Sequence, residues 1–197
     1  MAMQKVQIIS FALGLLGRKP IITLDNQNDI TAAAEQAFDF LVPVILSKGQ
    51  WRFATKIIQV SELEVDPIIT YWKYSYQLPS DYLKMIRQYP HNYDFEMYDD
   101  LKMYSNVGGP LYIEYIFQPS ISQFPPYFNE YLAYAIAENL ALSNAHSVTF
   151  ASKLAQDKGV IMAQALASDA QNRPQTPLMS QPIITNRAVT SYPYGQY

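Results

Sequence analysis

The hydrophobic pattern of this chain changes its period twice, and these two changes limit the folds that the chain can adopt. Up to residue 50, apolar residues recur at spacings of three and four, which is typical of amphipathic helices. Between residues 51 and 118 the pattern alternates, as in strands that bury one face. After Phe124-Pro125-Pro126 the helical spacing returns. The sequence therefore predicts an α+β fold in which β structure is inserted between two helical segments.

Four helices are expected, two on each side of the β insert. Gly17 should end the first, because glycine readily adopts the left-handed conformation that follows many helices. Pro43 lies within the second and should kink it, because proline removes a backbone donor. Proline at the start of the third is pre-organised for the first helical turn. The first and third predicted helices cover residues 4–16 and 127–145. Asp29 or Thr31 should cap the second, which runs to about Lys48, and Ser147 or Thr149 the fourth, which runs to about Ala170.

The alternating region predicts about five short strands in an antiparallel meander. Asp99-Asp100 and Gly108-Gly109-Pro110 have the composition of turns between strands. The clearest alternating segments are residues 71–78, 93–98, 101–105 and 111–117. The simplest arrangement of the whole chain is then a four-helix bundle, made of two N-terminal and two C-terminal helices, with the meander emerging from it.

These elements divide the chain into three parts. Residues 1–49 and 122–170 are expected to form the helical bundle, residues 50–121 the β-rich insert, and residues 171–197 an extended C-terminal arm. The arm holds four prolines, no acidic residue and no helical periodicity, so it should not fold by itself. It either binds a partner, which its composition favours, or lies against its own domain. The residues expected to bind a partner are Ile183, Ile184, Arg187, Val189, Tyr192, Tyr194 and Tyr197.

Composition indicates a protein that contacts other proteins. Charged residues make up 16% of the chain, against about 25% in an average globular protein. The 16 tyrosines suit either protein interfaces or a tyrosine-rich sheet that packs on its own helices. The net charge of −3 and the lack of a basic stripe argue against a nucleic-acid-binding surface. The chain contains no cysteine, and we expect neither a membrane span nor a signal peptide.

No catalytic motif is found, and we expect no enzyme activity, metal or cofactor. His91 and His146 stand apart from each other and from any carboxylate at metal-ligand spacing. Glu62, Glu64 and Asp66 form the densest acidic group, followed by Asp99-Asp100, and a solvated loop is the simplest interpretation of both. A pair of carboxylates could in principle cleave glycosidic bonds. Substitution of Glu62 or Glu64 would then abolish peptidoglycan turnover.

Several short motifs, taken in order, resemble one protein family. Trp51-Arg52-Phe53-Ala54 follows the second helix, and Gln77-Leu78-Pro79-Ser80-Asp81-Tyr82-Leu83 follows a tyrosine-rich strand. Phe124-Pro125-Pro126-Tyr127-Phe128 then opens a helix that contains Leu132-Ala133 and Ala137-Glu138-Asn139-Leu140-Ala141. Over residues 4–172 the chain resembles the tail tubular protein A family, the head-to-tail adaptors (connectors) of short-tailed bacteriophages.

The resemblance implies a structural protein of the virion, found in the tail or neck and assembled in the host cytoplasm. Such a protein forms a homo-oligomeric ring, commonly of twelve copies, between the portal protein and the tail nozzle protein, and it can also contact fibres. The ring extends and seals the channel through which genomic DNA passes without specific binding. The C-terminal arm of the family typically reaches the portal, which matches residues 171–197 in position and composition.

Two other functions stay open from the sequence. One is a different structural subunit of the neck or tail, such as a head-completion or nozzle-contact protein, which differs from an adaptor only in its place in the virion. The other is a wall-degrading tail enzyme, for which the acidic loops give little support. Deleting Gln171–Tyr197 is expected to leave a folded protein that no longer attaches to the portal.

Overall fold

The structure, a computed structural model, describes residues 4–24, 29–64, 71–89, 94–98, 101–143 and 148–172. Four α-helices lie within those residues: α1 (Lys5–Leu15), α2 (Asp29–Lys48), α3 (Pro126–Ser143) and α4 (Val148–Ala170). The strands are β1 (Thr55–Val60), β2 (Tyr74–Gln77), β3 (Tyr82–Tyr89), β4 (Phe95–Tyr98), β5 (Lys102–Ser105) and β6 (Leu111–Phe117). Two 3-10 helices, η1 (Arg52–Ala54) and η2 (Ile121–Gln123), stand at the two junctions between helical and β structure.

The fold is α+β, as predicted, but the strands do not form a meander. They form two antiparallel three-stranded sheets, with the orders β1-β6-β3 and β2-β5-β4. The first strand pairs with the last, so that Thr55 lies opposite Ile116 and Val60 opposite Leu111. Each sheet needs a second apolar layer, and the two sheets provide one for each other. The residues buried between them are Val60, Tyr76, Leu78, Met103, Leu111, Ile113, Tyr115 and Phe117.

Strand β3 was missing from the set of clearly alternating segments. Its pairing with β6 shifts register twice, between Tyr82 and Lys84 and again between Met85 and Arg87. Each shift places an extra residue on one strand, so the side chains of β3 do not keep to a period of two. The segment therefore lacks the alternating pattern by which a strand is recognised in a sequence.

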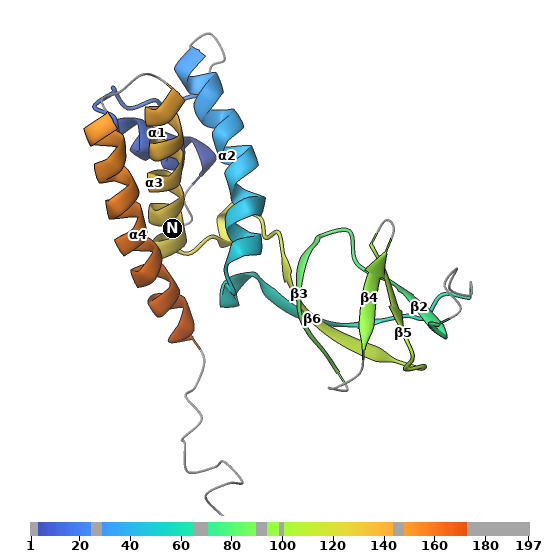
Figure 1. Cartoon of the computed structure of the whole chain (residues 1–197). Coiled ribbons are helices and arrows are strands. Elements are labelled where there is room, and N and C mark those ends of the chain that lie inside the picture. Colours follow the sequence, from blue (N-terminus) through green and yellow to red (C-terminus); the bar gives the residue numbers. More distant parts are fainter. Residues whose placement is uncertain are drawn as a thin grey trace, which may run out of the picture.

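The predicted four-helix bundle is wrong. Helix α3 lies at the centre, and α1, α2 and α4 each pack against it. Helix α4 also contacts η1. In Figure 1, α4, α3 and α2 lie side by side, and the short α1 crosses near one end of them. A helix of a bundle buries one stripe, whereas α3 is buried on most of its sides. Its buried residues are Phe128, Asn129, Tyr131, Leu132, Ala133, Ala135, Ile136, Ala137, Leu140 and Ala141.

The local signals at the helix ends were read correctly. Gly17 has a φ of +71° and follows α1, where its N–H donates to the carbonyl of Gly14 at 2.9 Å. The N–H of Arg18 then donates to the carbonyl of Leu13 at 3.0 Å, which satisfies a second carbonyl of the last turn. Pro126 is the first residue of α3. Helix α2 continues through Pro43 to Lys48, and the kink expected at Pro43 stays a prediction.

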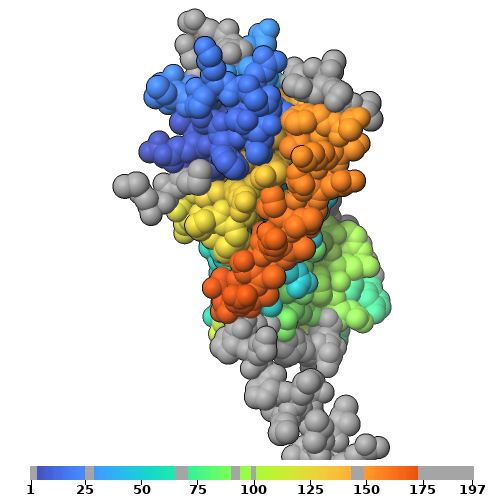
Figure 2. All heavy atoms as spheres, turned by 90° about the vertical axis from the view of Figure 1, so that its left-hand side faces the viewer, coloured from blue at the N-terminus to red at the C-terminus, as the bar shows by residue number. Residues whose placement is uncertain are grey.

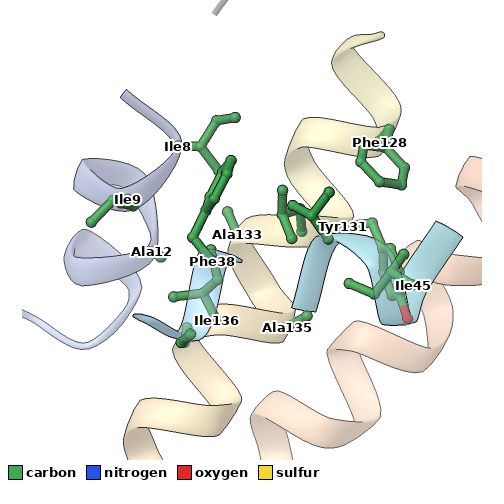
Figure 3. Packing of buried hydrophobic residues seen from close by; sticks show 14 of the residues in the cluster. Ile8, Ile9, Ala12, Phe38, Ile45, Phe128, Tyr131, Ala133, Ala135 and Ile136 are labelled. Carbon is green, nitrogen blue, oxygen red and sulfur yellow. The ribbon is translucent and has the colours of Figure 1, made fainter. Parts of the chain in front are cut away.

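The helices and the first sheet share one hydrophobic core. Figure 3 shows Ile8, Ile9 and Ala12 of α1 near Phe38 of α2, with Ala133 and Ile136 of α3 close to them. Ile116 of β6 belongs to the same core, and α2 contacts both β3 and β6. The sheets therefore extend from the end of the helical layer at which α2 finishes, as Figure 1 shows.

Candidate functional site at the joint between helices and sheets

The residues predicted to bind a partner cannot be placed in the structure. Ile183, Ile184, Arg187, Val189, Tyr192, Tyr194 and Tyr197 all lie outside the described residues. The description of the chain ends at Asn172, two residues after α4. Asn172 lies at the joint between the helices and the first sheet. This joint brings together the first and third of the motifs that carry the family resemblance.

An aromatic cluster forms the centre of the joint. The Trp51 side chain is fully buried, and its Nε1–H donates to the carbonyl of Ile45 at 3.0 Å, near the end of α2. Its ring centroid lies 5.1 Å from that of Phe128 in an edge-to-face arrangement. Phe53 in turn lies 4.9 Å from Phe128 and 6.2 Å from Phe124. These rings therefore pack the start of the β insert against the end of α2 and the start of α3.

Gly49 is required by the same arrangement. The indole of Trp51 folds back over the end of α2 to reach Ile45, and it passes directly over the Cα of Gly49. A Cβ atom at position 49 would meet the indole ring itself. The glycine before Trp51 therefore does more than end the helix, because it leaves the space in which the indole lies.

Asp169 joins the end of α4 to the first residues after Trp51. Its side chain is 1% exposed and accepts hydrogen bonds from the backbone N–H groups of Arg52 and Phe53. The hydroxyl of Tyr127 donates to the same carboxylate at 2.7 Å. Burial and the hydrogen bond to Asp169 raise the pKa of Tyr127 above its ordinary value. One carboxylate thus connects α3, α4 and η1.

An ion-pair network lies beside this contact on the first sheet. Glu114 of β6 has a side chain that is only 9% exposed, and its carboxylate lies 2.9 Å from Nε of Arg87 and 3.6 Å from a guanidinium nitrogen of Arg52. The hydroxyl of Tyr89 donates to Glu114 at 3.2 Å. A buried carboxylate needs such partners, because an uncompensated charge is costly away from water.

A groove opens between the network and the end of α4. Its volume is about 630 Å³, within the range of sites that hold ligands or short peptide segments. Phe53 and Tyr89 contribute aromatic surface, and Ile57 of β1 is 59% exposed. Asn172 is itself a lining residue, so the chain leaves α4 inside this groove. The full lining consists of Arg52, Phe53, Thr55, Ile57, Tyr89, Glu114 and Asn172.

The second motif of the family resemblance connects the two sheets. Leu78 is buried between them, and its N–H donates to the carbonyl of Leu101 at 2.8 Å. Asp81 accepts a hydrogen bond from Lys56 of β1 at 2.7 Å and another from the hydroxyl of Tyr115 at 2.9 Å. Burial alone would raise the pKa of Asp81, but these bonds hold that pKa below its usual value. The motif therefore has a structural role in the described fold.

The acidic residues considered for catalysis are not assembled into a site. Glu62 is exposed and accepts a hydrogen bond from the N–H of Gly109 at 3.3 Å. Asp66, Asp99, Asp100, His91 and His146 lie outside the described residues. Within the ranges that the structure covers, no three histidine or carboxylate side chains come together as metal ligands would.

Of the two buried carboxylates at the joint, the sequence gives a signal for Glu114 but none for Asp169. Glu114 interrupts an otherwise apolar strand, which signals a buried carboxylate with partners. Asp169 gives no such signal, because it lies on a helix among polar and small residues. Its role depends on α4 bringing it to residues 52 and 53, which lie 117 and 116 positions earlier in the chain.

Helix α2 bears on the expectation that the chain has no membrane-spanning segment. By length and composition, α2 is apolar enough to cross a membrane, although no stretch of that kind was expected. Its apolar face, which includes Phe38 and Leu46, is buried in the core. Its Glu35 and Asp39 both accept hydrogen bonds from Lys5 of α1 at 2.8 Å. These contacts are those of a helix that packs against other helices of the same chain.

The outer face of α4 is exposed along most of the helix. Figure 2 shows α4 along the surface over its whole length. Between residues 152 and 170, Lys153 is the one fully exposed charged residue, while Asp157 and Lys158 are half-buried. Helices that face water usually carry charged residues on that side. The exposed residues of this face are Ser152, Lys153, Ala155, Gln156, Gly159, Val160, Ala163, Gln164, Ala167, Ser168 and Ala170.

Comparison with known proteins adds no identification. Neither the protein-family models nor the curated protein sequences give a match to this chain.

Proposed function

We propose that this protein is a head-to-tail adaptor of a short-tailed bacteriophage, a structural protein that forms a ring between the portal and the tail nozzle. In this proposal the ring extends and seals the DNA channel, and the C-terminal arm attaches the ring to the portal. The chain would act by its surfaces and its shape, without catalysis and without a cofactor.

The observation that carries the proposal is the sparsely charged outer face of α4. A protomer of a closed ring needs two different surfaces, one for each neighbour. The helical layer has α4 on one flank and α2 on the other, and α3 lies between them. The α4 flank has one fully exposed charge, Lys153, while the α2 flank presents Phe40, which is 66% exposed. Two flanks of different chemistry suit contact with two neighbours in a ring.

The family resemblance supports the proposal at the level of packing. The motifs that carry it are the residues that build the joint and connect the sheets: Trp51 and Phe53, Phe124 and Phe128, Leu78 and Asp81. A shared packing scheme is a reason for short motifs to recur at these separations. The net charge of −3 also suits a channel wall along which DNA slides, because basic contacts to phosphates would hold the DNA.

The test is assembly on the portal. The purified full-length chain is mixed with the portal protein encoded by the same virus, and the mass of the products is measured by light scattering. We expect a complex that holds several copies of the chain for each portal ring, with ring-shaped particles in electron micrographs. The absence of a complex at micromolar concentrations would reject the proposal.

A different neck or tail subunit is the alternative. Such a protein would also assemble without catalysis, so only its position distinguishes it from an adaptor. Antibody labelling of intact virions, viewed by electron microscopy, would place the protein. Label directly beneath the portal supports the adaptor, whereas label at the nozzle supports a nozzle-contact subunit.

A further inference from the structure

The groove at the joint has two unusual properties in combination. It is lined by an exposed aliphatic side chain, Ile57 of β1, and by the aromatic rings of Phe53 and Tyr89. It is also the place where the chain leaves α4, because Asn172 contributes to its wall. A further 25 residues follow Asn172 in the sequence.

Hydrogen bonds hold Gln171 and Asn172, the two residues that follow α4, beside the groove. The N–H of Asn172 donates to the carbonyl of Asp169 at 3.2 Å, and the N–H of Gln171 donates to the carbonyl of Ala167 at 3.3 Å. Asp169 is in turn held by the backbone of Arg52 and Phe53. The last described residues are thus connected to one wall of the groove through Asp169.

The sequence that follows has the chemistry that such a groove binds. It reads Arg173-Pro174-Gln175-Thr176-Pro177-Leu178, with two prolines three positions apart. Segments with this spacing favour the polyproline II conformation, and aromatic-lined grooves bind them at a low cost in conformational entropy. Six extended residues span up to about 20 Å, which is enough to cross a groove of this size. We propose that residues 173–178 occupy the groove of their own chain.

This contact sets where the remainder of the C-terminal segment begins. With residues 173–178 held against β1 and β6, residues 179–197 start from the sheet side of the joint and not from the free end of α4. The residues expected to bind the portal, from Ile183 onward, all lie beyond the docked portion. The inference concerns the isolated chain and holds whether or not the proposed ring function is correct.

The experiment uses the lack of cysteine in the chain. One double variant carries Ile57→Cys and Thr176→Cys, which places one thiol in the groove and one in the docking segment. The matched control carries Ser168→Cys and Thr176→Cys, because exposed Ser168 on α4 lies as close to Asn172 along the chain as Thr176 does. Both are oxidised mildly as full-length proteins, and the products are separated by non-reducing electrophoresis. Each variant is first shown to melt at the temperature of the wild type.

We expect the Ile57 and Thr176 pair to form an intramolecular disulfide roughly ten times faster than the control pair, because docking raises the local thiol concentration. Equal rates for the two pairs, or a faster control, would overturn the proposal. Crosslinked dimers in place of crosslinked monomers would also overturn it, since the groove would then hold the segment of a second copy.

Discussion

At the scale of single residues, the joint depends on a few side chains that meet from distant parts of the chain. Trp51 fills the space between the end of α2 and the start of α3, and Gly49 provides the room for its ring. Asp169 fastens α4 to the same place through two backbone donors and a tyrosine hydroxyl. Because these contacts are buried, changes here should alter folding before they alter any surface.

Replacing Trp51 with alanine should destabilise the protein strongly. The side chain is fully buried, so the substitution leaves a cavity and removes the indole hydrogen bond to the carbonyl of Ile45. We expect a loss of about 3–5 kcal/mol in the free energy of unfolding, measured by urea denaturation followed by circular dichroism. Trp51→Phe keeps an aromatic ring against Phe128 and should cost clearly less. A loss below about 1 kcal/mol for Trp51→Ala would contradict the described packing.

Stability should fall as the pH rises above 10. Burial, followed by the nearby charges of Glu62 and Tyr74, raises the pKa of Tyr76 from its ordinary value of 10.0 to about 12. Between these values the unfolded chain releases the proton while the folded chain keeps it. The unfolded state then binds fewer protons, so the free energy of unfolding decreases with pH. The pKa values of Tyr115 and Tyr127 are also raised, mainly by burial, which adds to the decrease.

The measurement is urea denaturation at pH 9, 10 and 11, with Tyr76→Phe as the matched variant. The variant lacks the titrating hydroxyl and also its hydrogen bond to the carbonyl of Val107. It should be less stable than the wild type at pH 9 and should lose less stability between pH 10 and 11. Parallel curves for the two proteins would show that Tyr76 does not contribute to the pH dependence.

At the scale of elements, α3 lies at the centre of the helical layer, and the flanking helices α2 and α4 each leave one face exposed. Helix α4 buries Ala151, Leu154 and Ala165 toward α3 and leaves its other side exposed. Predicting the helices needed only their hydrophobic spacing, and their bounds follow closely from the sequence. The hydrophobic spacing does not predict which helix lies at the centre. Helix α3 has apolar residues on most of its sides, so its sequence does not show which helix packs on which side.

A charge on the outer face of α4 should block assembly without unfolding the protein. Ala163 is exposed, so Ala163→Arg should change the melting temperature little. In the proposed ring, however, the arginine would be buried against the neighbouring copy, where an unpaired charge is costly. We expect the variant to form no ring on the portal, as judged by light scattering. Ala163→Ser is the matched control, because it keeps a small side chain and should assemble normally.

If neither Ala163→Arg nor Ala163→Ser assembles, the loss is not caused by the added charge. Normal assembly of Ala163→Arg would exclude the α4 face from the ring contact.

At the scale of the whole molecule, the helical layer and the pair of sheets are held together by the shared core and by the joint. The C-terminal segment begins at that joint, so the proposed attachment to a partner and the integrity of the joint can be tested together. Two truncations separate these contributions: one ends the chain after Leu178, the other after Asn172.

The chain that ends after Leu178 should melt like the full-length protein but fail to attach to the portal, because it lacks the residues from Ile183 onward. The chain that ends after Asn172 should also fail to attach. In addition its melting temperature should fall by about 2–4 °C for each kcal/mol contributed by docking in the groove. Scanning calorimetry and portal binding measure the two effects. Portal attachment by the shorter chains would contradict the role of the arm, and equal melting temperatures would contradict the docking.

The sequence by itself determined the elements whose signals are local. The helix ends at Gly17 and Pro126, the change of period at Trp51 and the strands β2, β4, β5 and β6 follow from the properties of neighbouring residues. The tertiary structure alone decided the pairing of β1 with β6, the central place of α3 and the role of Asp169. Each of these joins residues that are far apart in the chain, and a hydrophobic pattern shows that a face must be buried but not against which partner.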